Sequence, residues 1–120
     1  MTTGTVFIVE DDADTREMLG HFLQLEGYEI ETAANGQQAL EQLAAGSRAR
    51  VILLDLMMPV MDGWQFRREQ ARRRDIAAIP VIVVSAAGRD RIAEISADAY
   101  LSKPVDLDEL LTCVNAYWRD

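Results

Sequence analysis

Each of four apolar runs in this 120-residue chain is closely followed by polar side chains. The runs cover residues 6–9, 51–54, 81–84 and 99–101, and the polar residues that follow them are Glu10, Asp11 and Asp12, then Asp55, then Ser85, and finally Lys103. Short apolar runs that alternate with helical patterns are typical of βα units, which build a parallel sheet. The polar residues of such strands meet at the carboxyl edge of the sheet, where ligands bind in open α/β folds.

The segments between these runs predict one further strand and the first two helices. A first helix has apolar residues at helical spacing from Met18 to Leu23 and ends near Gly27. Residues 28–32 alternate between apolar and polar, which predicts an edge strand with one wet face, whereas the unbroken runs at 51–54 and 81–84 indicate strands covered on both faces. Asn35 is a suitable N-cap for a second helix, which Gly46 ends.

Three more helices complete the predicted pattern. The third runs from about Trp64 to Arg74, a shorter fourth follows Gly88, and a fifth begins at Asp106, which has capping-box spacing to Glu109. The residues of the fifth helix expected to face the sheet are Leu107, Leu110, Leu111 and Val114. Five βα units fill the chain, so we expect a single domain over residues 1–120.

The net charge of −8 argues against a function based on binding nucleic acid, which requires a basic surface. A local exception is the arginine cluster, Arg67, Arg68, Arg72, Arg73 and Arg74. These arginines are spread around the helix axis, which favours a solvated helix surface. A docking patch for an acidic partner is the alternative interpretation.

Cys113 is the only cysteine, which rules out an internal disulfide and suits a reducing compartment. The first residues lack the basic start and long apolar stretch of a signal peptide, and no apolar run approaches membrane-spanning length. We therefore expect a cytoplasmic protein without a membrane partner.

The clustered carboxylates suggest a metal site. Neighbouring carboxylates repel one another unless a cation screens them, and hard oxygen ligands suit Mg²⁺. Glu10, Asp11 and Asp12 therefore suggest a magnesium site that Asp55 completes. The alternative is that these acids stabilise the N-terminus of the following helix, and Asp12 and Asp14 fit that role well.

Asp55 and Lys103 suggest phosphate chemistry. A lone carboxylate at the end of an apolar strand is costly to bury without a purpose, and a carboxylate can act as a nucleophile toward phosphorus. Lys103 is the only lysine among 12 basic residues, and its ammonium group would serve phosphate as a point charge; the alternative is a surface lysine at a turn. The Ser85 hydroxyl either ends a strand in a turn or donates to a phosphoryl oxygen. Tyr100 is either an ordinary strand aromatic or a side chain whose packing depends on the hydrogen bonding of Ser85.

At the level of motifs, the whole chain resembles a known family. The segments VFIVEDD, VILLDLMMPVMDGW, VIVVSA and AYLSKP stand in the order found in the receiver domain of two-component response regulators, of the stand-alone kind related to chemotaxis regulators. The resemblance implies an α/β, flavodoxin-like (βα)5 fold, a doubly wound parallel sheet with strand order 2-1-3-4-5. It also implies that a histidine kinase or phosphotransfer protein donates a phosphoryl group to one aspartate.

The resemblance assigns roles to individual residues. The phosphoacceptor falls on Asp55 and the family's lysine on Lys103, with Pro104 behind a cis peptide. The hydroxyl switch falls on Ser85 and the switch aromatic on Tyr100.

The resemblance also places the metal ligands. Aligning Arg16 with a basic or polar position early in the family's first helix makes Glu10 and Asp11 the acidic pair and leaves Asp12 outside it. The resemblance then implies that Mg²⁺ is held by Asp11, Asp55 and the Met57 carbonyl oxygen, with Glu10 acting through water.

Two departures from the family pattern shape the expected behaviour. Met57 and Ala87 are apolar where many relatives have polar groups that position water, which predicts slow self-dephosphorylation. The stretch from Ser85 to Lys103 is about four residues shorter than usual, which is close to one helical turn and predicts a monomer.

We therefore expect a phosphorylation-dependent signalling switch that is not an enzyme, acts alone and binds an unidentified downstream protein. Two alternatives stay open. A degenerate receiver would be an interaction module that works without phosphorylation, and an aspartyl-phosphate phosphohydrolase would normally have a second acid at the position of Met57.

Overall fold

Strands and helices alternate regularly in the computed structural model, which describes residues 4–118. The strands are β1 (Thr5–Val9), β2 (Glu29–Ala33), β3 (Ala49–Leu54), β4 (Val81–Ser85) and β5 (Ala99–Ser102). The helices are α1 (Ala13–Leu25), α2 (Gly36–Ala44), α3 (Gly63–Ala71), α4 (Arg89–Ile92) and α5 (Leu107–Tyr117). All strands pair in parallel in the order β2-β1-β3-β4-β5, which confirms the predicted doubly wound fold.

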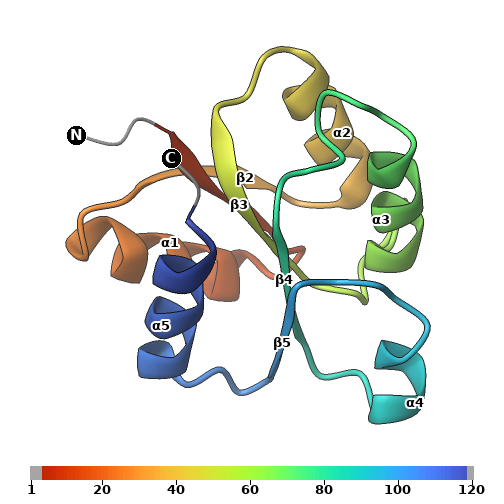
Figure 1. Cartoon of the computed structure of the whole chain (residues 1–120). Coiled ribbons are helices and arrows are strands. Elements are labelled where there is room, and N and C mark those ends of the chain that lie inside the picture. The colour runs from red at the N-terminus through yellow and green to blue at the C-terminus, as the bar shows by residue number, and fades with distance from the viewer. Residues whose placement is uncertain (1–3, 119–120) are drawn as a thin grey trace.

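Helices cover both faces of the sheet (Figure 1). One face packs against α1 and α5, and the other against α2, α3 and the short α4. Successive residues of the central strands point to opposite faces, so that Val6 and Ile8 of β1 face α1 and α5 while Phe7 and Val9 face the other layer. The unbroken apolar runs are therefore buried on both sides, as predicted, and the alternating strand β2 lies at an edge.

Several predicted helix ends are confirmed. Asn35 caps α2 by accepting a hydrogen bond from the Gln38 N–H at 2.9 Å, and Asp106 caps α5 by accepting from the N–H groups two and three residues later. Gly27 and Gly46 follow the last turns of α1 and α2 with φ of 97° and 107°, a conformation that glycine adopts without strain.

Helix α3 ends at Ala71, three residues before the predicted end at Arg74. The reason is Gln70, a fully buried polar side chain whose amide nitrogen donates to the carbonyl oxygens of Ile76 at 2.9 Å and Ile79 at 3.1 Å. These bonds hold the chain after α3 in turns, so that the arginines at 72–74 do not continue the helix.

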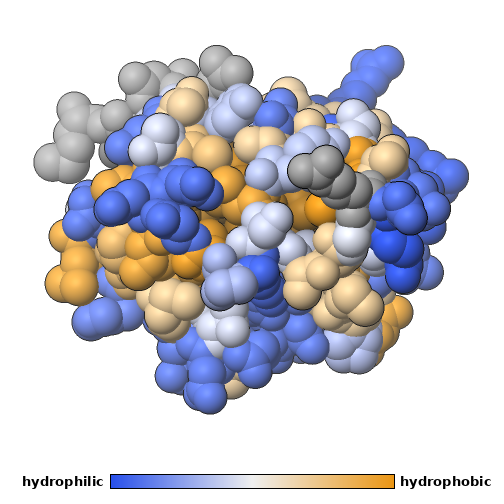
Figure 2. Space-filling view, turned by 90° about the horizontal axis from the view of Figure 1, so that it is seen from below, coloured by the Kyte–Doolittle hydropathy of each residue, from blue (hydrophilic) through white to orange (hydrophobic). Residues whose placement is uncertain are grey.

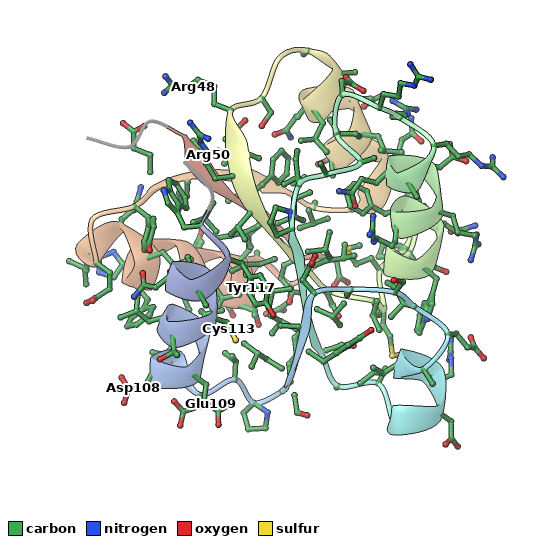
Figure 3. The ribbon with its side chains drawn as sticks, in the orientation of Figure 1. Arg48, Arg50, Asp108, Glu109, Cys113 and Tyr117 are labelled. Carbon is green, nitrogen blue, oxygen red and sulfur yellow. The ribbon has the colours of Figure 1, made fainter. Side chains whose placement is uncertain are left out.

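Helix α5 has a buried side and a charged start (Figure 3). Leu110 and Val114 are buried as predicted, whereas Leu111 is only half-buried. Cys113 is half-buried and packs against the same cluster, and Asp108 and Glu109 point outward from the first turn. Acidic groups at this end favour the helix macrodipole.

The surface seen from below the view of Figure 1 mixes orange hydrophobic with blue hydrophilic side chains (Figure 2). Among the large apolar side chains exposed on the molecule, Val60 is 80% and Met57 is 55% accessible. Over the described residues, no helix combines the length and the apolar character that crossing a bilayer requires.

Candidate functional site

The ends of β1 and β3 bring three carboxylates together. Val9 pairs with Leu54 in the sheet, and the Asp55 N–H donates to the Val9 carbonyl oxygen at 3.0 Å, so the residues that follow the two strands are neighbours. One carboxylate oxygen each from Glu10, Asp11 and Asp55 lies within 4.8 Å of the others. Glu10 and Asp55 are buried, and Asp11 is exposed.

Lys103 reaches this cluster from the end of β5. Its Nζ lies 2.6 Å from Glu10 Oε1 and 3.4 Å from Asp55 Oδ2. The Lys103 N–H donates to the Ser85 carbonyl oxygen at 3.1 Å, and the peptide bond to Pro104 is cis. Residues separated by 93 positions therefore meet at the carboxyl edge of the sheet, where the strand pattern placed them.

Burial controls the charge of Glu10. Its side chain is 2% exposed, and this burial, together with the negative charge of Asp55, raises the pKa of Glu10 to about 7 even though Lys103 and the Asp12 N–H stabilise its anion. Burial also disfavours the charged form of Lys103, but the contacts with Glu10 and Asp55 outweigh it and raise the pKa of the ammonium. The cluster therefore holds three carboxyl groups and one ammonium, which contacts only Glu10 and Asp55.

Asp12 has a different role from its two acidic neighbours. Its Oδ2 accepts hydrogen bonds from the Thr15 N–H at 2.9 Å and the Thr15 hydroxyl at 2.6 Å, which caps α1 and lowers the pKa of Asp12. Its own N–H donates to Glu10 Oε2 at 3.1 Å, and Arg16 donates to the Glu10 carbonyl oxygen at 2.8 Å. The helix-capping alternative therefore describes Asp12, whereas Glu10 and Asp11 lie with Asp55.

Ser85 and Met57 flank the carboxylates. Ser85 is 1% exposed at the end of β4, and its hydroxyl oxygen accepts from the Ala87 N–H at 3.1 Å. The Met57 N–H donates to Asp55 Oδ1 at 3.3 Å, and its side chain projects into solvent.

Tyr100 lies on β5. Its side chain is 42% exposed, and its hydroxyl donates to the Ile95 carbonyl oxygen at 2.7 Å and accepts from the Ala97 N–H at 3.1 Å. The hydroxyl is therefore held by the segment that leads into β5.

Gly63 supports the site in a way that the sequence analysis missed. A Cβ at this position would lie 2.6 Å from the Asp55 carbonyl oxygen and 2.7 Å from the Leu56 Cα, so only glycine allows α3 to start this close to the chain that follows β3. The sequence contained a sign of this role, because Gly63 directly follows Asp62, the N-cap of α3.

Trp64 and Arg91 form a second contact that the sequence analysis missed. The Trp64 indole N–H donates to the Arg91 carbonyl oxygen at 3.0 Å, and the Arg91 guanidinium lies 4.4 Å from the centre of the ring. Met57 lines the same hollow of about 380 Å³. No pattern linked these residues, which are 27 positions apart.

A sequence profile described as the response regulator receiver domain matches residues 6–115. The chain belongs to this receiver domain family. The receiver domain is 36% identical to the "Transcriptional regulatory protein CpxR homolog" of Haemophilus influenzae and 37% identical to the "Response regulator MprA" of Mycolicibacterium vanbaalenii. Each alignment covers 95% of this chain and 50% of the relative, so the chain spans about half the length of these curated relatives.

Solved structures agree with this assignment. The receiver domain is similar to the chemotaxis response regulator CheY4 of Vibrio cholerae, with a TM-score of 0.86, 32% identity, and coverage of 97% of this chain and 99% of that one. A response regulator receiver protein from Pseudomonas putida gives a TM-score of 0.90 at 28% identity, covering 97% and 98% of the two chains.

Proposed function

We propose that this receiver domain is a phosphorylation-dependent switch of a two-component system, which accepts a phosphoryl group on Asp55 from a histidine kinase or a phosphotransfer protein. The observation that carries the proposal is the position of Lys103, whose ammonium group contacts two buried carboxylates, Glu10 and Asp55, at the open edge of the sheet. A structural ion pair would need one carboxylate, whereas a phosphoryl site needs a nucleophile and a cation together.

In the transfer, a carboxylate oxygen of Asp55 attacks phosphorus. The new oxygen–phosphorus bond forms as the bond between phosphorus and the donor imidazole nitrogen breaks, and that nitrogen keeps the electron pair. The Lys103 ammonium neutralises charge on the phosphoryl oxygens, and the Ser85 hydroxyl donates a hydrogen bond to one of them.

The donor set fits Mg²⁺, because the three carboxylates offer hard oxygens within 4.8 Å of one another. Asp11, Asp55 and the Met57 carbonyl oxygen would hold the ion, with Glu10 acting through water. When bound, Mg²⁺ supplies positive charge that stabilises the transferring group.

The output follows from a rearrangement of Ser85 and Tyr100. A hydrogen bond from Ser85 to the phosphoryl group frees space beside β5, and Tyr100 turns inward from its bonds with the 95–97 segment to fill it. The surface that changes is built from residues 86–98, β5 and α5, and it binds a downstream protein rather than nucleic acid or membrane.

Because Met57 and Ala87 offer no side-chain hydrogen bond to an attacking water, the phosphorylated form is long-lived. The lone cysteine suits a cytoplasmic site of action.

Intact-mass measurement after incubation with acetyl phosphate and Mg²⁺ tests the proposal. The wild-type protein should gain one HPO₃ unit, and the Asp55→Asn variant should gain none. Asp75→Asn is the matched control, since Asp75 is an exposed aspartate outside the cluster, and it should be labelled like the wild type. Undiminished labelling of Asp55→Asn would refute the assignment of the acceptor, and a wild-type protein that stays unlabelled would refute the switch.

A further inference from the structure

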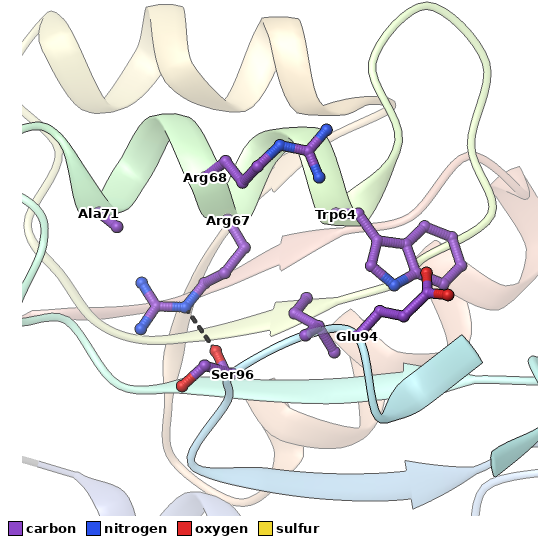
Figure 4. A pocket seen from close by; sticks show the side chains of 7 residues that line it. Trp64, Arg67, Arg68, Ala71, Glu94 and Ser96 are labelled. Atoms are coloured by element: carbon purple, nitrogen blue, oxygen red, sulfur yellow. Dashed lines mark hydrogen bonds between the residues drawn. The ribbon is translucent and has the colours of Figure 1, made fainter. Parts of the chain in front are cut away.

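A groove of about 340 Å³ lies between α3 and residues 94–96, and none of the residues that line it belongs to the carboxylate cluster (Figure 4). Its apolar surface comes from Trp64, Ala71 and Ile95. Trp64 and Ile95 are 7% and 6% exposed, so each offers only an edge of its side chain at the floor of the groove. The volume lies near the lower end of the range found for ligand pockets.

One wall of the groove has an arginine that is fixed in place. Arg67 Nε donates to the Ser96 carbonyl oxygen at 2.8 Å, and Nη1 donates to Gln70 Oε1 at 3.1 Å (Figure 4 shows the first bond). Gln70 is itself fully buried and bonded to two carbonyl oxygens, so the guanidinium rests on a rigid support. An arginine held in this way loses little conformational entropy when it binds a carboxylate.

The charge around the groove is opposite to that of the whole chain. The net charge is −8, yet five of the 12 basic residues lie within residues 67–74. Arg67 and Arg68 line the groove against a single acid, Glu94. Among the described residues, Arg72 is paired with Glu69 at 3.5 Å, whereas neither Arg67 nor Arg68 has an ion-pair partner.

We infer that this groove docks an acidic segment of a protein partner, with an apolar side chain on the Trp64 and Ile95 floor and carboxylates on Arg67 and Arg68. Nucleic acid fits less well, because a phosphate backbone requires an extended basic surface and this one is local, concave and partly apolar. The inference goes beyond the proposed function and does not depend on phosphorylation of Asp55.

A display selection of random short peptides on immobilised wild-type protein tests the inference. Enriched peptides should combine aspartate or glutamate with a large apolar residue, and the synthetic peptide of the most enriched sequence is then measured by fluorescence anisotropy. The double variant Arg67→Glu, Arg68→Glu should bind this peptide at least about tenfold more weakly, which corresponds to about 1.4 kcal/mol. Arg73→Glu, Arg74→Glu makes the same change of charge on exposed residues outside the groove and should bind within about threefold of the wild type.

Each outcome of these binding measurements either supports or overturns the inference. Enrichment of peptides without acidic residues, or equal weakening in both double variants, would overturn the inference. Binding of a single-stranded oligonucleotide as tight as that of the peptide would also overturn it in favour of a nucleic-acid surface. Arg68→Glu alone guards against misfolding, because Arg68 is exposed and the bond to Gln70 comes from Arg67, and it should weaken peptide binding while leaving the melting temperature unchanged. The binding measurements use unphosphorylated protein, so failure of the phosphorylation proposal leaves this test intact.

Discussion

Replacing Glu10 by Gln should make the metal-free protein more stable at alkaline pH, although the change removes an ion pair. In the folded protein, burial beside Asp55 raises the pKa of Glu10 from 4.5 to about 7, and this net effect already includes the attraction of Lys103. The folded state therefore binds the Glu10 proton more tightly than the unfolded state does. In the wild type the Lys103 ammonium also lies 3.4 Å from Asp55 Oδ2, so it should keep Asp55 as a partner in the variant.

The sign and size of the effect follow from linkage. Below pH 4.5 the Glu10 carboxyl is protonated in both the folded and the unfolded state, so it does not lower the stability of the folded state. As the pH rises toward 7, the unfolded state releases this proton first. The stability of the folded state falls through this window, and the cost is fully present above pH 7. A rise in pKa from 4.5 to about 7 corresponds to about 3 kcal/mol, or on the order of 10 °C in melting temperature for a domain of this size.

Thermal unfolding in EDTA between pH 4 and pH 8 measures the effect. The melting temperature of Glu10→Gln minus that of the wild type should grow with pH and level off above pH 7. Glu41→Gln, on the exposed side of α2, is the control and should give a small difference at every pH. A difference for Glu10→Gln that does not depend on pH, or a variant less stable than the wild type at pH 8, would refute the reasoning.

Four other outcomes follow from the site and its surroundings. Millimolar Mg²⁺ should raise the melting temperature of the wild type and raise that of Asp11→Asn much less, because a ligand of the folded state stabilises it by mass action; equal shifts would count against Asp11 as a ligand. Met57→Asn and Ala87→Glu together should speed loss of phosphate, followed by intact mass, because they supply groups that orient water; unchanged decay would show that another step limits hydrolysis. Val60→Gly should raise the free energy of unfolding by about 1 kcal/mol, with Val60→Ala intermediate, because this exposed β-branched residue has a φ of 69°; a loss of stability would show that its side chain packs usefully. Light scattering should find a monomer with or without Mg²⁺ and beryllofluoride, because α4 has only four residues and leaves little area for a symmetric pair; a shift to a dimer would contradict this.

The sheet and the convergence of its polar residues could be predicted because both depend on local pattern. A parallel strand buried on both faces must be apolar throughout, so the unbroken apolar runs at 51–54 and 81–84 can be recognised as central strands. The carboxyl ends of parallel strands lie at the same edge of the sheet. The N-cap roles of Asn35 and Asp106 could also be predicted, since an N-cap needs a short polar side chain at one position relative to the first helical turn.

Other features depend on contacts between distant side chains, and no local pattern encodes them. The end of α3 was wrong by three residues because the carbonyl partners of Gln70 lie six and nine positions further along the chain. The arginine cluster was interpreted as a solvated surface, yet Arg67 is half-buried and bonded to Ser96, 29 positions away.

Trp64 lines both hollows described above, with the loop that follows Asp55 on one side and the arginine groove on the other. If a ligand in one hollow shifts the shared indole, the shape of the other hollow changes as well, and binding on the two sides is then thermodynamically linked. Such linkage is reciprocal, so any factor by which phosphorylation changes the affinity of a bound peptide is the factor by which that peptide changes the phosphorylation equilibrium. A partner that recognises the groove would thereby help to set how much of the protein is phosphorylated for a given supply of phosphoryl donor.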